Sequence, residues 1–186
     1  MFLLEGRNTI TRYDCLTKSI TRCTTDLRMK VGAAYCVTPN QRLFVLGGKQ
    51  ALRSCFEILL PSSDGSRHSN IEPAAKYKFK SRASMSIERW AHSVTYLRDE
   101  LLIVTGTTFA DQLSKKAECY IIESNHWQVL PDLNEGRAGH ASCGFRARSV
   151  FVFCGFVITG SSFQATNSIE MLDIFGHTGD NEDLQW

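Results

Sequence analysis

Three basic residues recur at matching places along the chain, each shortly before an apolar run: Lys30, Arg89 and Arg137. An arginine presents a planar fork of donors that fits a carboxylate or a phosphate, and a lysine offers a compact positive charge. If the three cations rim one opening of the fold, they can bind an acidic segment of another protein. Trp90, directly after Arg89, would add an aromatic anchor. We therefore predict these four residues as partner-binding positions.

A structural role for the same cations is the alternative. Each would then pair with an acidic residue of its own repeat unit, such as Glu88 or Glu135. A charge that is paired in this way inside the protein is not available to a ligand. The sequence leaves both interpretations open.

The histidines do not form a catalytic or metal-binding pattern. His92 and His140 stand at equivalent places, but the third equivalent place holds Ala33. No pair of histidines has the spacing of a metal site, so a repeated structural role is favoured over metal ligation or base catalysis. We predict no catalytic residue, no metal and no cofactor, and therefore no enzyme.

The seven cysteines form no Cys-x-x-Cys pair. Cys119, Cys143 and Cys154 lie within strand-like patterns, where we expect buried and unreactive thiols. The N-terminal stretch lacks the basic start and apolar segment of a secretory signal. We therefore expect reduced thiols and a cytoplasmic protein.

Length and composition predict one soluble globular domain. The chain has 186 residues, 43% of them hydrophobic, and its 21 basic and 19 acidic residues give a net charge of +2. This balance gives no overall attraction to nucleic acid or to an anionic membrane. No apolar stretch approaches the ~20 residues of a membrane span. We expect neither nucleic acid nor membrane as a partner.

Three apolar runs that each end at glycine reveal an internal repeat: LFVLGG, LLIVTG and VFVFCG. Gly47 and Gly106 are 59 residues apart, and Gly106 and Gly155 are 49 apart. The corresponding basic residues are 59 and 48 residues apart. Two independent anchors therefore agree to within one residue, and Gly48 completes a double glycine in the first run.

The repeat extends over the whole chain. Tyr13 is followed seven residues later by Ile20, as Tyr120 is followed by Trp127. Acidic residues also match from copy to copy at Glu57, Glu118 and Glu170. The units are a half repeat at about 8–23 and three copies at about 28–82, 86–132 and 134–186, all in a single region, 1–186.

Each copy predicts four short strands. In the clearest copy they are His92–Tyr96, Leu101–Thr105, Ala117–Ile122 and Trp127–Leu130. No window shows a helical period, and polar insertions at 62–70 and 175–183 lengthen two copies. Four-stranded units at ~50-residue spacing are typical of β-propeller blades. Glycine at the end of the second strand would allow close approach where neighbouring blades crowd.

These features resemble the kelch-repeat family of β-propellers. Its pattern is a basic or Arg-led start, an apolar strand that ends in Gly-Gly, and an acidic or apolar residue with Tyr-Asp. A Trp and a Leu-Pro close each unit. The copy at 86–132 carries it through Arg89, His92, Gly106, Glu118, Tyr120, Trp127, Leu130 and Pro131. Only Gly47 and Gly48 form a full double glycine, and Ile20 replaces one Trp. The resemblance implies an all-β propeller of four-stranded blades that binds partners through loops on one face.

About three and a half blades are present, fewer than the ~4–8 of a closed ring. Three interpretations follow: a fragment of a longer product, an open arc with exposed blade faces, or an arc closed by a second copy. Open blade edges would favour self-association.

The function expected from the resemblance is a non-catalytic scaffold for protein–protein interaction. Substrate adaptors of ubiquitin ligases in this family carry a BTB or F-box segment, and none is found in this sequence. One alternative is a kelch-fold enzyme that acts on a sugar. The other is a fragment, without a function of its own, of a longer kelch protein such as a ubiquitin-ligase substrate adaptor.

Overall fold

The computed structural model describes residues 2–5, 8–13, 15–59, 76–98, 100–109, 112–174 and 185–186. These residues form sixteen strands and no helix, which confirms the prediction of an all-β chain. Within them, there is consequently no helix that could cross a membrane. The insertions predicted at 62–70 and 175–183 lie outside the described residues.

The N-terminal half of the chain forms one seven-stranded sheet. It combines an antiparallel group, β1 (Phe2–Glu5), β2 (Thr9–Tyr13) and β3 (Ile20–Thr25), with a second antiparallel group, β4 (Ala34–Val37), β5 (Leu43–Leu46), β6 (Cys55–Leu59) and β7 (Lys76–Ser81). The two groups join where β3 runs parallel to β7 over two residue pairs. We call β4–β7 the first sheet. The predicted half repeat corresponds to β2 and β3, and β1 adds a strand that the sequence did not predict.

The middle sheet has the four strands expected for the clearest copy. They are β8 (Ser93–Leu97), β9 (Leu101–Phe109), β10 (Gln112–Ile121) and β11 (His126–Leu130), in consecutive antiparallel order. Tyr120 pairs with Trp127 across β10 and β11, and Tyr13 pairs with Ile20 in the same way across β2 and β3. The residue spacing noticed in the sequence is thus a shared hairpin register.

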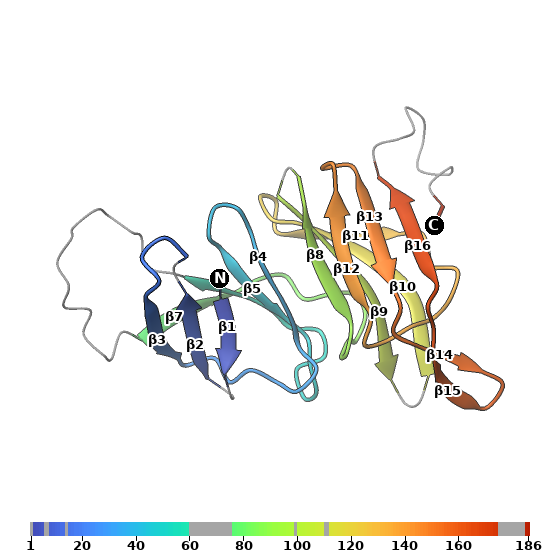
Figure 1. The fold of residues 1–186 in the computed structure, drawn as a ribbon, viewed down its shortest axis with the longest axis horizontal. Helices are drawn as coiled ribbons and strands as arrows, with labels where there is room; N and C mark the ends of the chain where they lie inside the picture. The colour runs from blue at the N-terminus through green and yellow to red at the C-terminus, as the bar shows by residue number, and fades with distance from the viewer. Residues whose placement is uncertain are drawn as a thin grey trace.

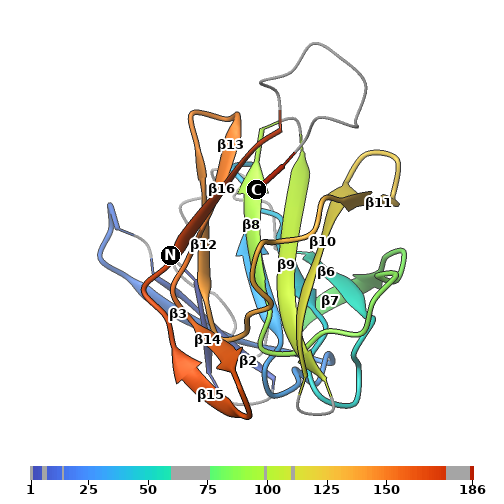
Figure 2. The same ribbon diagram turned by 90° about the vertical axis from the view of Figure 1, so that its right-hand side faces the viewer.

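The last sheet differs from the predicted four-stranded unit. Its described strands are β12 (Ala141–Phe145), β13 (Ser149–Phe153) and β16 (Ile169–Asp173). Between β13 and β16 the chain forms a separate hairpin of β14 (Phe156–Thr159) and β15 (Ser162–Ala165), which extends beyond one end of the sheet (Figures 1 and 2).

The sheets follow one another along the molecule, with the seven-stranded sheet on one side and the middle and last sheets on the other (Figure 1). β8 contacts both β4 and β12, so the first strands of the three sheets are neighbours. Apolar side chains fill the spaces between successive sheets. One core lies between β2–β3 and the first sheet, a second between the first and middle sheets, and a third between the middle and last sheets.

Backbone hydrogen bonds show which residues of the sheets are equivalent. Gly47 N–H donates to Ser54 O, and Cys154 N–H donates to Ser168 O. The left-handed φ angles of Gly47, Gly106 and Cys154 are 58°, 63° and 56°. The counterpart of Gly106 is therefore Cys154, 48 residues away, and not Gly155 as the sequence predicted.

Gly155 instead matches Gly48, the second glycine of the first run. Their φ angles are 91° and 93°. The correction removes the one-residue disagreement between the glycine and arginine spacings. Cys154 occupies a backbone conformation that ordinarily favours glycine.

Gly47 and Gly106 do lie where successive sheets crowd. A Cβ at Gly47 would be 2.5 Å from Arg89 O, and a Cβ at Gly106 would be 2.3 Å from Arg137 O. No side chain fits at such distances, so glycine at these two positions lets the next sheet approach.

Candidate functional site

Arg89 is a structural residue of the middle sheet. Its side chain is fully buried, as is that of Glu118, and its Nε and Nη2 donate to Glu118 Oε1 at 3.0 and 2.9 Å. Its Nη1 donates to the carbonyl oxygens of Gly106 and Lys116 at 2.7 and 2.9 Å. Burial lowers the pKa of Arg89, and the charge of Glu118 opposes this effect. We call this arrangement the arginine socket.

Arg137 fills an equivalent socket in the last sheet. It is also fully buried, and its Nη2 pairs with Glu170 Oε1 at 2.5 Å. Its Nη1 donates to the carbonyl oxygens of Cys154 and Ser168 at 2.9 and 3.4 Å. Glu135 adds a longer ion pair at 3.4 Å.

The prediction that Arg89 and Arg137 bind a partner is therefore not supported by their placement. Both guanidinium groups are buried and have acceptors within their own sheets, so a ligand cannot reach them. The structural alternative describes them correctly, with Glu118 and Glu170 as the main acids. Glu135 takes a minor part, and no ion pair to Glu88 is found among the described residues.

Lys30 is the counterpart of Arg89 in the first sheet, but the acid of the socket is missing there. In the middle and last sheets, the socket glutamate pairs across the sheet with Val104 or Val152. The equivalent residue of the first sheet is Val45, whose pairing partner is Phe56. Glu57, the predicted counterpart of Glu118, lies one residue further along and on the opposite face of the strand. The sequence alignment of the copies was thus one residue off at this position.

A hollow of about 250 Å³ occupies the place of the socket in the first sheet. Gly47 and Ser54 line it, and these are the counterparts of Gly106 and Lys116, whose carbonyls bind Arg89. Apolar side chains make up much of the remaining wall: Leu27, Met29, Val45, Ala51, Phe56 and Phe79. Asp26, Arg28 and Lys30 also line it. We call this hollow the vacant socket.

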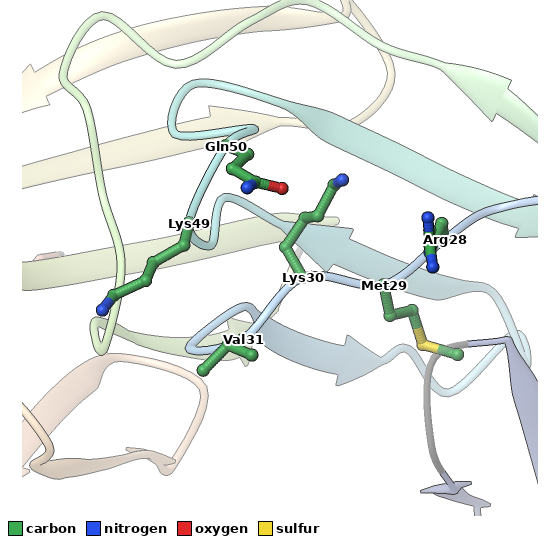
Figure 3. A pocket seen from close by; sticks show the side chains of 6 residues that line it. All are labelled: Arg28, Met29, Lys30, Val31, Lys49 and Gln50. Atoms are coloured by element: carbon green, nitrogen blue, oxygen red, sulfur yellow. The ribbon is translucent and has the colours of Figure 1, made fainter.

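A second hollow of about 340 Å³ adjoins the vacant socket and shares Arg28, Met29 and Lys30 with it. Val31, Lys49 and Gln50 complete its lining (Figure 3). Three of its six residues are cations and none is acidic. Within the described part of the chain, these three cations take part in no ion pair. We call this hollow the cationic pocket.

Trp90 lies next to the cationic pocket. Lys49 Nζ stands 4.3 Å from the centroid of the Trp90 ring, a cation–π contact. A Cβ at Gly32 would meet the ring at 2.9 Å, so the ring also packs against the backbone of that glycine. Trp90 N–H donates to Thr107 Oγ1 at 3.0 Å, which holds the residue between the first and middle sheets.

The structure therefore brings together two of the four predicted binding residues, Lys30 and Trp90. Sequence reasoning missed Arg28 and Lys49. Both had a local signal, because Arg28 alternates with Lys30 along an extended segment and Lys49 directly follows the double glycine. The vacant socket could not have been found from the sequence, since it depends on the register of β5 and β6.

The histidines are buried between sheets. His140 Nε2 is 2.9 Å from Thr105 Oγ1. Among the described residues neither ring nitrogen of His92 has a hydrogen-bond partner, because Leu46 stands at the place of Thr105. Burial, followed by the nearby arginines, lowers the pKa of His92 to about 3 and that of His140 to about 4. The described residues contain no group of three or more potential metal ligands.

The cysteines only partly match the expected burial. All seven are free, and burial raises the pKa of Cys119 to about 12. Cys143 and Cys154 are exposed, contrary to the prediction. Cys143 lies on the uncovered face of the last sheet, and Cys154 lies at the end of β13.

Comparison with known proteins adds information on the fold alone. No protein-family model and no curated protein matches the sequence. Among solved structures, the chain is similar to YjhT, with a TM-score of 0.64 and 16% identity over 91% of this chain and 50% of that one. The chain thus spans about half the length of that protein.

Proposed function

We propose that this chain is part of a kelch-type β-propeller that acts as a non-catalytic module for protein–protein interaction. The repeated pattern of glycines, arginines and glutamates supports the kelch assignment. Stacked antiparallel sheets joined by the equivalent residues of each copy are consistent with propeller blades. The partner is an acidic segment of another protein, with an apolar side chain next to its carboxylates.

The vacant socket beside the cationic pocket is the observation that carries this proposal. Lys30, Lys49 and Arg28 attract carboxylates, and the lining of the cationic pocket contains no acid; Asp26 is the one acidic residue in the lining of the adjoining vacant socket. The cations are exposed or half-buried, so each can reach a ligand, unlike Arg89 and Arg137.

The vacant socket adds a second determinant of binding, an apolar hollow for one side chain of the bound segment. Its walls of Leu27, Val45, Phe56 and Phe79 favour an aliphatic side chain over a polar one. A segment that places carboxylates over the cations can insert the intervening leucine or methionine into this hollow. Charge then provides the attraction, and shape selects the neighbouring residue.

Binding of short labelled peptides tests this proposal. We expect a peptide with a Glu-Leu-Glu centre to bind at least about tenfold more tightly than its Glu-Ala-Glu and Gln-Leu-Gln analogues, as measured by fluorescence anisotropy at low salt. The double variant Lys30→Glu/Lys49→Glu should lose this binding.

The matched control is Lys80→Glu/Lys115→Glu, which changes the net charge equally at exposed lysines outside the pocket lining. It should bind the peptide with no more than about a twofold loss, a difference of ~0.4 kcal/mol. Equal loss in the two double variants would show that the attraction is a general charge effect and would overturn the proposal.

A further inference from the structure

The last sheet leaves one apolar face uncovered. Cys143, Phe145, Phe151, Phe153, Ile169 and Met171 lie on this face, which we call the outer face. Phe145, Met171 and Ile169 are 48%, 45% and 59% exposed. The phenylalanines contact one another along the face, with ring centroids 6.0 Å apart for Phe145–Phe151 and 6.1 Å apart for Phe151–Phe153.

The equivalent face of the middle sheet is buried. Ile103 pairs with Cys119 there, as Phe151 pairs with Met171 in the last sheet. Ile103 and Cys119 form the core with Val150 and Val152 of the sheet that follows. In the first sheet, Phe44 and Leu46 are covered by the middle sheet in the same way. Only at the last sheet is a covering sheet missing from the described chain.

A backbone donor marks the same missing contact. Gly48 N–H donates to Arg89 O of the following sheet at 2.9 Å, and Thr107 N–H donates to Arg137 O at 3.2 Å. Gly155 is the equivalent residue of the last sheet. Its N–H has no acceptor in the part of the chain that the structure describes. Both the apolar face and this donor are therefore arranged for a further sheet of the same kind.

We propose that a second copy of this chain covers the outer face, in a head-to-tail pair that closes on itself. Head-to-tail contact repeats the way in which each sheet of the chain is covered by its successor. YjhT, which has the same fold, is about twice as long as the matched region, so two copies together would provide a comparable number of sheets. Closure at two copies leaves no outer face exposed, whereas an unclosed head-to-tail contact would produce filaments.

This inference does not rest on the acidic-segment site, whose apolar walls belong to the core between β2–β3 and the first sheet. Its first test is the mass of the full chain by light scattering on a sizing column over a range of concentrations. We expect a single species of twice the 20.9 kDa chain mass. A monomer at every concentration, or a polydisperse series of filaments, would overturn the proposal.

Paired variants locate the contact. Phe145→Lys/Met171→Lys places charges on the outer face at half-exposed positions and should give a folded monomer, with an unchanged circular dichroism spectrum. Val129→Lys/Phe163→Lys makes the same chemical change at residues that are 72% and 50% exposed elsewhere, and should remain dimeric. A dimer that survives the first pair would contradict the assignment of the outer face.

Thiol reactivity provides a readout without any substitution. Cys143 lies on the outer face and is exposed in the single chain. Dimer formation should slow alkylation of Cys143, followed by peptide mass spectrometry, at least tenfold as protein concentration rises. A Cys143 rate that stays independent of concentration, while the mass doubles, would place the contact elsewhere.

Discussion

The first and middle sheets contain the same backbone socket with different side chains. In the middle sheet, Arg89 and Glu118 fill it completely and are shielded from solvent. In the first sheet, Lys30 and Phe56 leave it vacant, and the lysine lies instead at the wall of a cationic pocket. A basic residue at this repeat position is thus structural when its sheet supplies an acid, and available for binding when it does not.

Glu57, the glutamate of the first sheet, forms ion pairs on the opposite face of the sheet from the socket. Glu57 faces the middle sheet, where it accepts hydrogen bonds from Arg42 at 2.6 Å and from Arg82. Arg42 also pairs with Glu100 of the middle-sheet segment at 3.1 Å. Burial raises the pKa of Glu57, but the two arginines outweigh this effect and hold the pKa below its ordinary value. Glu57 is therefore engaged by two arginines of its own sheet, one of which also reaches Glu100, and it does not neutralise Lys30.

Removing the socket acid should have the largest effect. Glu118→Gln leaves the Arg89 charge buried without its partner, so we expect a loss of about 3–5 kcal/mol in the free energy of unfolding. Lys30→Gln at the equivalent position of the first sheet should change stability by no more than about 0.5 kcal/mol. Urea unfolding measures both. Similar losses of unfolding free energy for the two variants would contradict the claim that, of these two sheets, only the middle one has a buried ion pair in its socket.

Acid should weaken the contacts between sheets through the buried histidines. Their folded pKa values, about 3 for His92 and about 4 for His140, lie below the ordinary value. The unfolded chain therefore binds more protons below about pH 6.5, and stability falls as pH falls toward 4, by up to ~1.4 kcal/mol per pH unit for each histidine.

The control for this effect is His92→Gln/His140→Gln. Between pH 6.5 and 4.5 its unfolding free energy should depend much less on pH than that of the unsubstituted chain, whatever its absolute stability. Equal slopes in this window would mean that the histidines titrate normally in the folded protein.

The two equivalent left-handed positions should respond unequally to alanine. Gly106→Ala introduces a Cβ 2.3 Å from Arg137 O in addition to an unfavourable φ, so we expect a loss of more than about 1 kcal/mol. Cys154→Ala changes a residue that already has a Cβ and is exposed, so its effect should stay within ~0.5 kcal/mol. Thermal unfolding of the two variants compares the end of a strand that the following sheet covers, at Gly106, with one that is exposed, at Cys154.

Local patterns predicted much of the fold. Alternating apolar residues and turn signals located the four strands of the middle sheet to within a few residues, except that β9 and β10 extend further. The spacing shared by Tyr120–Trp127 and Tyr13–Ile20, which the sequence offered only as a sign of the repeat, corresponds to a common hairpin register. Alignment of the copies by residue type was wrong at two positions. Glu57 was aligned with Glu118 and Gly155 with Gly106, and the structure displaces each by one residue. In a strand, one residue changes the face of the sheet.

The candidate site was predicted only in part for the same physical reason. Lys30 and Trp90 lie at the pocket, but Arg89 and Arg137 are buried because their own sheets place an acid opposite them. Sequence spacing identified the repeated cations. Whether each is paired depends on a glutamate about 30 residues further along the chain, whose orientation the spacing alone does not reveal.

Rebuilding the socket in the first sheet tests the central claim most directly. The variant Lys30→Arg/Phe56→Glu should fill the vacant socket as Arg89 and Glu118 do, and isothermal titration should show that binding of the Glu-Leu-Glu peptide is lost. Lys30→Arg alone keeps the charge without the acid and should retain binding. Undiminished binding by the double variant, with its fold intact, would contradict the claim that the vacant socket is the binding site.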